Sequence, residues 1–169
     1  HSKEENMSVI SFMEEKIVKS KVHKVNMPKE IEKKCHVAIH TATAAAATAG
    51  TFPIPMSDAV PISIAQVAMV VSLGKAFGIS LSESVAKSII NVTIAQQAGR
   101  AIFSNVLKAI PGAGTVIGGI VGGLTAAVLT EALGWIVADD FYRMSEGKDP
   151  ENIAEHASEL KQLFTGLRM

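Results

Sequence analysis

Residues 114–134 decide the fold of this chain and read GTVIGGIVGGLTAAVLTEALG. Small residues recur through this stretch every four positions, a spacing that places them on one face of a helix. A glycine inside a helix costs up to about 1 kcal/mol relative to alanine, so a row of glycines indicates the close approach of another helix. We therefore expect a glycine-zipper helix whose packing residues are Gly114, Gly118, Gly122, Ala126 and Gly134.

Two interpretations of this helix remain open. The uncharged run at residues 109–130 is long enough to span a bilayer. The same run also suits the buried central helix of a bundle, and Glu131, the Pro-Gly break at Pro111 and the acidic pair Asp139-Asp140 favour that alternative. We expect a self-contained bundle, with membrane contact as a conditional state.

The charges lie at the two ends of the chain. Residues 1–36 contain eight lysines and six acidic residues, and residues 139–169 contain seven acidic and four basic residues, whereas the middle has few charges. Lys plus Arg and Asp plus Glu are equal at 16 each, and aromatic residues are 5% of the chain. A neutral chain with few stacking platforms does not have the basic excess of a nucleic-acid-binding protein. We expect no nucleic-acid partner.

Prolines, glycines and capping residues divide the chain into helices. The predicted helices cover residues 6–24, 29–49, about 57–77, 80–109, 115–144 and 152–164. The fold class is therefore all-α: a compact bundle of about six helices with glycine- and alanine-rich central hairpins. We expect the small face of residues 114–134 to pack against the alanine-rich residues 42–49. Residues 1–28 are interpreted as an N-terminal amphipathic helix or linker, and residues 29–169 as one helical domain.

The residue pattern predicts no catalytic chemistry. Cys35, His36 and His40 have no further metal ligand nearby, so we expect no metal site. The chain contains no Walker motif and no recognisable catalytic set, which predicts a non-enzymatic protein without a cofactor. Arg100 and Glu131 are isolated charges in apolar surroundings, where a structural ion pair or a proton or ion path could account for them. A single cysteine and the lack of a visible secretion signal predict a cytoplasmic location.

One stretch resembles a known family. Residues 44–59 read AAAATAGTFPIPMSDA, and residues 64–69 read IAQVAM. This sequence resembles DUF697, a bacterial family of unknown function in which an alanine-rich helix leads into a Pro-Ile-Pro-Phe-x-Asp-Ala loop. Pro53, Pro55 and Asp58 match that loop, while Met56 replaces the commoner phenylalanine. IPGAG at residues 110–114 and ALG at residues 132–134 also fit, so the resemblance covers roughly residues 32–143.

The resemblance implies which proteins and which location the chain is associated with, and it implies no activity. Such domains are often fused to the C-terminal side of small GTPase domains of the Era or dynamin-like type, and they are suspected of membrane association. It therefore implies a helical module that associates with a GTPase domain in cis or in trans, peripheral to or inserted in the inner membrane. The alternatives are a soluble scaffold that forms homo-oligomers or docks a partner, and a pore-forming or lipid-binding helical domain. No GTPase motif occurs in this chain, so GTP binding is not implied.

Overall fold

The computed structural model describes residues 18–49, 59–98, 123–153 and 156–168. Within these ranges the chain forms helices and no strand, which confirms the predicted all-α bundle of about six helices. The helices are α2 (Ser20–Val22), α3 (Lys29–Ala49), α4 (Ala59–Ala76), α5 (Glu83–Ala98), α7 (Gly123–Ser145) and α8 (Ala157–Arg168).

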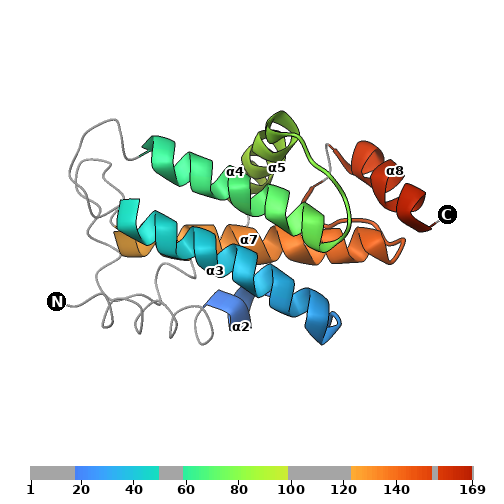
Figure 1. The fold of residues 1–169 in the computed structure, drawn as a ribbon, viewed down its shortest axis with the longest axis horizontal. Coiled ribbons are helices and arrows are strands. Elements are labelled where there is room, and N and C mark those ends of the chain that lie inside the picture. The colour runs from blue at the N-terminus through green and yellow to red at the C-terminus, as the bar shows by residue number, and fades with distance from the viewer. Residues whose placement is uncertain (1–17, 50–58, 99–122, 154–155, 169) are drawn as a thin grey trace.

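Helix α7 is the centre of the bundle, and α2, α3, α4, α5 and α8 all contact it. Figure 1 shows α3 and α4 side by side along α7, with α8 near the C-terminal end of that helix. Every side chain in residues 130–141 is buried. A helix in such a position has a covering partner on each face, so most of its circumference is apolar.

The membrane alternative concerned residues 109–130, and residues 109–122 lie outside the described part of the chain. Among the helices that the structure describes, none is long and apolar enough to cross a membrane.

Glycines end α4 and α7 as the sequence predicts. Gly78 and Gly147 have positive φ angles of 84° and 79°, in the left-handed region that favours glycine. The residue after each glycine donates its backbone N–H to a carbonyl of the last turn: Ile79 to Gly74 at 2.9 Å, and Lys148 to Arg143 at 2.8 Å. These are Schellman motifs, which satisfy the free carbonyls at a helix end.

Helix α5 begins later than the sequence predicts. The predicted helix at residues 80–109 takes Ser80 as its cap, because Glu83 follows it at the spacing of a capping box, but the helix begins at Glu83. The hydroxyl of Ser82 accepts the backbone N–H of Val85 at 3.2 Å, so Ser82 is the capping residue. Ile79 and Leu81 are buried, and their burial holds the chain non-helical up to this cap.

Helix α8 also begins later, at Ala157 instead of residue 152. The buried carboxylate of Asp140 on α7 accepts the backbone N–H groups of Glu151, Asn152 and Ile153 at 2.9, 2.7 and 3.0 Å. It also accepts a hydrogen bond from Arg143 at 2.8 Å. Because these N–H groups point at Asp140, the segment is held in a loop against α7, where Ile153 is buried.

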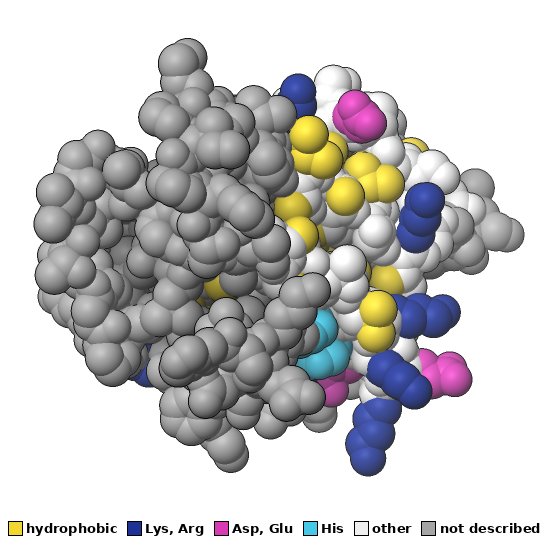
Figure 2. Space-filling model, turned by 60° about the vertical axis from the view of Figure 1, so that its left-hand side comes forward, with side chains coloured by type: hydrophobic (Ala, Val, Ile, Leu, Met, Phe, Trp, Pro, Cys, Tyr) yellow, Lys and Arg dark blue, Asp and Glu magenta, His cyan; other side chains and the backbone are white. Residues whose placement is uncertain are grey.

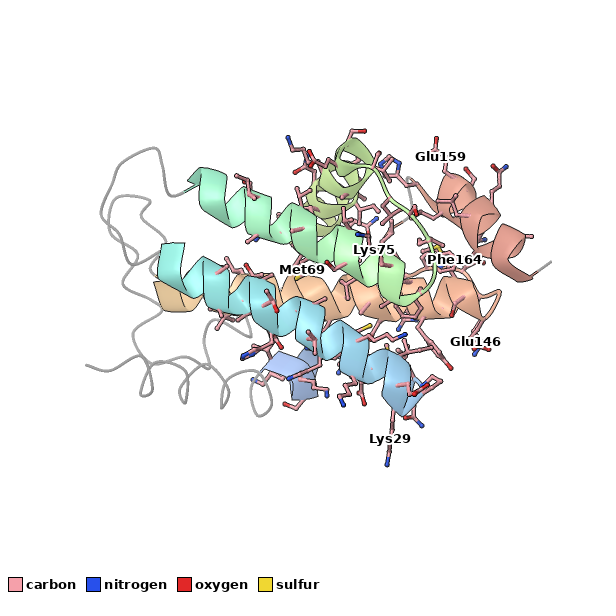
Figure 3. The ribbon with its side chains drawn as sticks, viewed as in Figure 1. Lys29, Met69, Lys75, Glu146, Glu159 and Phe164 are labelled. Atoms are coloured by element: carbon pink, nitrogen blue, oxygen red, sulfur yellow. The ribbon has the colours of Figure 1, made fainter. Side chains whose placement is uncertain are left out.

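Three phenylalanines join α8 to the rest of the bundle. The rings of Phe77, Phe141 and Phe164 form a triangle, with centroid distances of 6.1 Å from Phe77 to Phe141, 5.9 Å from Phe141 to Phe164 and 6.4 Å from Phe77 to Phe164. Figure 3 shows Phe164 directed into the bundle while Glu159 on the same helix points outward. The amphipathic pattern of the last helix thus buries its apolar face against α7.

The predicted N-terminal helix at residues 6–24 lies mostly outside the described residues. Its described end is the short helix α2, after which His23 adopts an extended backbone conformation. Val18, Val22 and Met27 are buried, so this segment packs against the bundle.

The small-residue row meets other helices at Gly134. A Cβ atom at this position would lie 2.7 Å from Cγ1 of Ile39 on α3 and 2.9 Å from Sδ of Met69 on α4. The expected neighbours were residues 42–49; at Gly134 the contact on α3 is about one turn earlier. Ala126 is buried, while Gly114, Gly118 and Gly122 lie outside the described residues.

Replacing Gly134 by alanine is expected to destabilise the protein by about 1–3 kcal/mol, because the added methyl overpacks against the buried, branched Ile39. Gly166→Ala is the matched control, since a Cβ atom there meets nothing within 4 Å. That change is expected to stabilise α8 by up to about 1 kcal/mol through helix propensity. Urea unfolding followed by circular dichroism measures both. A Gly134→Ala variant as stable as Gly166→Ala would contradict the close packing.

Candidate functional site

A row of polar and aromatic side chains follows one face of the buried helix α7. Glu131, Trp135 and Asp139 are spaced by four residues, which places them along one side of the helix. All three are at most 2% exposed. Charged groups almost never occupy such positions without partners, so each carboxylate requires hydrogen-bond donors from elsewhere in the chain.

The partner of Asp139 is His23, 116 residues earlier in the sequence. Nδ1 of His23 lies 2.5 Å from Oδ1 of Asp139, and Nε2 lies 2.9 Å from Oε1 of Glu32 on α3. Because each ring nitrogen faces a carboxylate oxygen, both nitrogens act as donors, and this geometry fits the imidazolium form. His23 therefore bridges α3 and α7 with a positive charge.

Trp135 and Lys19 complete this group, which we call the His23 cluster: Lys19, His23, Glu32, Trp135 and Asp139. The imidazole ring of His23 packs on the indole of Trp135 with centroids 4.4 Å apart. Nζ of Lys19 lies 4.9 Å from the centroid of Trp135 and 3.5 Å from Oε1 of Glu32. The indole is thus covered by cationic groups, an arrangement that its ring electrons favour.

The backbone of the N-terminal segment takes part as well. The N–H of Lys24 donates to Oδ2 of Asp139 at 2.6 Å. Asp139 therefore uses one oxygen for the side chain of His23 and the other for the backbone of the next residue. The His23 cluster fastens the segment that precedes α3 to the central helix.

The charges of the cluster stabilise one another. Burial alone would lower the pKa of His23, but the hydrogen bond and charge of Asp139, followed by those of Glu32, outweigh it, so the pKa is raised above the ordinary 6.5. Burial alone would raise the pKa of Glu32, but the hydrogen bond from His23 and the charge of Lys19 lower it below 4.5. The imidazolium and the Glu32 carboxylate are thus both favoured.

Glu131 connects the cluster to α3. Its Oε2 accepts the hydroxyl of Thr43 at 2.7 Å, and its Oε1 accepts the indole N–H of Trp135 at 2.9 Å. Glu131 is thus a buried carboxyl group with hydrogen-bond partners on α3 and on α7 itself. Arg100, the other predicted buried charge, lies outside the described residues.

The nearby cysteine is not activated. Burial, followed by the negative charges of Asp139 and Glu32, raises the pKa of Cys35 to about 12, so this group stays a thiol at neutral pH and is a poor nucleophile. His36 and His40 stack with ring centroids 5.8 Å apart. In the described part of the chain, no three His, Cys, Asp or Glu side chains are arranged to hold a metal ion.

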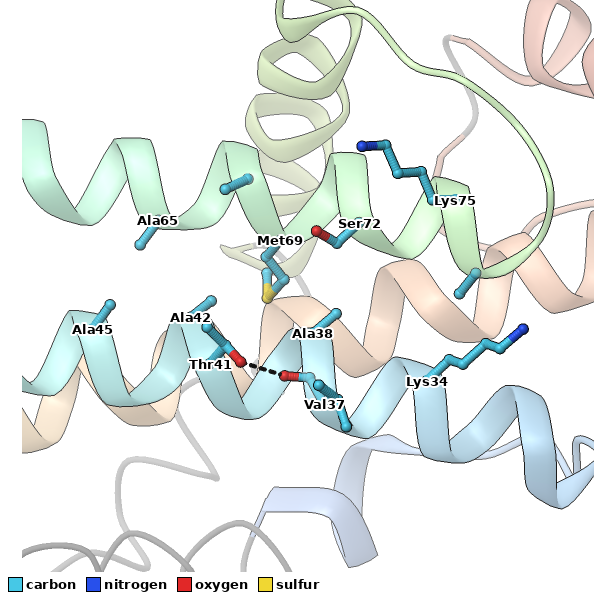
Figure 4. Close-up of a pocket in the computed structure, with 12 residues that line it drawn as sticks. Lys34, Val37, Ala38, Thr41, Ala42, Ala45, Ala65, Met69, Ser72 and Lys75 are labelled. Carbon is cyan, nitrogen blue, oxygen red and sulfur yellow. Dashed lines mark hydrogen bonds between the residues drawn. The ribbon is translucent and has the colours of Figure 1, made fainter.

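A second feature is a surface groove between α3 and α4. It has a volume of about 600 Å³, and Figure 4 shows side chains of both helices along it. Figure 2 shows apolar side chains on the surface of the molecule with lysines at their margin. Val37, which lines this groove, is 57% exposed, and Ile64 on the other side of α4 is 63% exposed. We call this feature the α3–α4 groove.

The predicted loop motif of Pro53, Pro55 and Asp58 lies outside the described residues, so the structure does not relate it to either feature. The His23 cluster escaped prediction because its members are far apart in sequence. A usable signal was present on α7, where Glu131, Trp135 and Asp139 form a four-residue row within an apolar helix. Nothing in the sequence connects His23 to that row.

The sequence comparisons give the family. The family described as a domain of unknown function, DUF697, matches residues 13–165. The chain belongs to this family. The match includes every member of the His23 cluster and both walls of the α3–α4 groove, so both features lie inside the DUF697 region. No curated protein and no solved structure matches the chain.

In this DUF697 protein, His23→Gln is expected to lower the free energy of unfolding by about 1–3 kcal/mol at pH 6, because a neutral amide cannot make two charge-assisted hydrogen bonds. The raised pKa means that the stabilisation by His23 is fully present below about pH 6.5 and is lost as the pH rises through the raised value. The lowered pKa of Glu32 adds stability above about pH 4.5 that is lost in acid.

Urea unfolding at a series of pH values measures this effect, and Trp135, the only tryptophan, gives a local fluorescence signal. His156→Gln is the control, since His156 lies outside the cluster. If the wild type and His23→Gln lost stability with the same slope above pH 6.5, His23 would not be the titrating group.

Proposed function

We propose that this DUF697 chain is a non-enzymatic, cytoplasmic helical module that works with a GTPase domain, in the same polypeptide or in another, and couples it to a partner. The observation that carries this proposal is the attachment of residues 19–24 to α7 through the His23 cluster. The GTPase is part of the proposal because, in the family that the chain resembles, a GTPase domain often precedes the helical module. Residues 19–24 then connect the GTPase domain to the helical bundle.

The cluster gives this connection two distinct states. With His23 in place, Asp139 has a charged partner; with His23 withdrawn, Asp139 is a buried carboxylate that has lost it. Removing one partner from a buried pair costs about 3–5 kcal/mol. A GTPase domain that moves the segment therefore changes the contacts of Trp135, and through Glu131 those of Thr43 on α3.

A protein partner suits the surface better than a flat lipid layer. The exposed apolar surface of α3 and α4 includes a concave groove, a shape that receives a protruding side chain or helix. Membrane association and homo-oligomerisation are the other forms of coupling, and the experiment below separates a GTPase partner from a second copy of the chain.

A photo-reactive amino acid in place of Lys21, an exposed residue of α2, is expected to cross-link in the source cell to a polypeptide with GTP-binding motifs, or to such a domain in the same polypeptide. Lys148, exposed at the end of α7, is the control position and is expected to give no such cross-link. Mass spectrometry identifies the joined peptides. Cross-links from Lys21 only to a second copy would favour the homo-oligomeric scaffold, and no GTPase peptide from either position would contradict the proposal.

A further inference from the structure

The α3–α4 groove is lined by residues of α3 and α4, and among them Met69 also contacts Gly134 of α7. On α3, Ile39 and Thr43 contact α7, whereas the groove is lined by residues such as Lys34, Thr41 and Ala45. Lys34 and Ala45, at the two ends of the groove on α3, are eleven positions apart. At 1.5 Å per residue this is roughly 17 Å, or about three helical turns.

The side chains on both sides of the groove are mostly small. Alanines line the groove from both sides, among them Ala38 and Ala45 on α3 and Ala65 and Ala68 on α4. The distance between packed helices depends on the side chains at their contact, so alanine walls admit a third helix at close range. An amphipathic helix enters such a groove through apolar anchors that recur every three to four residues.

The charged side chains that line the groove are both positive and lie toward the same end. Lys34 on α3 and Lys75 on α4 lie on the two sides of the groove toward one of its ends, whereas Ala45 and Ala65 lie toward the other end (Figure 4). No carboxylate lines this groove, and neither lysine has an ion-pair partner among the residues that the structure describes. The hollow on the opposite side of α4 differs, because Glu83 lines it beside Lys75 and Lys87.

Two lysines at one end also select an orientation. The carboxyl end of a helix carries a partial negative charge, and acidic side chains in its last turn add to it. We propose that the α3–α4 groove binds an acidic amphipathic helix of a partner protein, with the carboxyl-terminal turn of that helix between Lys34 and Lys75. This site is separate from the His23 cluster and does not depend on the GTPase association.

The probe is a displayed library of amphipathic helices of about 14 residues, roughly four turns, with variable residues in the first and last turns. The immobilised full chain is expected to enrich helices with Asp or Glu in the last turn. An enriched peptide, labelled with a fluorophore, is then titrated with the full chain and its anisotropy is measured.

The Lys34→Glu/Lys75→Glu double variant is expected to weaken this binding by about tenfold or more, and added salt is expected to weaken it for the wild type. Lys87→Glu is the matched control, since Lys87 lines the opposite hollow and not the groove, and we expect it to bind within about twofold of the wild type. Ala68→Arg, an exposed change in the groove wall, is expected to block the peptide while leaving the circular dichroism of the chain unchanged.

Three outcomes would overturn the proposal: no enriched helix, enriched helices without acidic last turns, or binding that the double variant retains. Flotation with vesicles of phosphatidylglycerol and phosphatidylethanolamine tests the membrane alternative. If vesicles bind the wild type and not the double variant while no peptide binds, the groove belongs to a lipid-binding face. Because Lys21 cross-linking is a different measurement, failure of the groove proposal and failure of the GTPase proposal are distinguishable.

Discussion

The burial of residues 130–141 of α7 is the constraint on which the rest of the structure depends. Its carboxylates lie where no water reaches them, so each must be satisfied by another part of the chain. Asp139 binds His23 and the backbone of Lys24, and Asp140 binds the backbone of residues 151–153. Helix α7 therefore holds residues 23–24, which precede α3, and residues 151–153, which precede α8, through hydrogen bonds as well as apolar packing.

This arrangement separates two properties of the molecule. The His23 cluster lies inside the bundle and controls where the N-terminal segment is attached, whereas the α3–α4 groove lies on the surface and offers a binding face. Helix α3 takes part in both, since Glu32 and Thr43 contact the buried side and Lys34 and Ala45 line the groove.

Much of the fold could be predicted from local patterns. The limits of α3 and the glycine ends of α4 and α7 depend on the residues themselves, because proline, glycine and helical periodicity act within a few residues. The starts of α5 and α8 could not be predicted in the same way. Ser82 replaces Ser80 as the cap where Ile79 and Leu81 are buried, and Asp140 holds residues 151–153 out of a helix.

The sequence by itself determined the family, through the match of residues 13–165 to DUF697. It also determined the all-helical class and the presence of an apolar central helix with small residues, since these follow from composition and local spacing. Only the tertiary structure decided that His23 meets Asp139, that Ile39 and Met69 cover Gly134, and that two lysines share one end of a groove. The physical reason is distance along the chain. His23 and Asp139 are 116 residues apart, and their hydrogen bond forms because the packing of α2 and α3 on α7 brings them together.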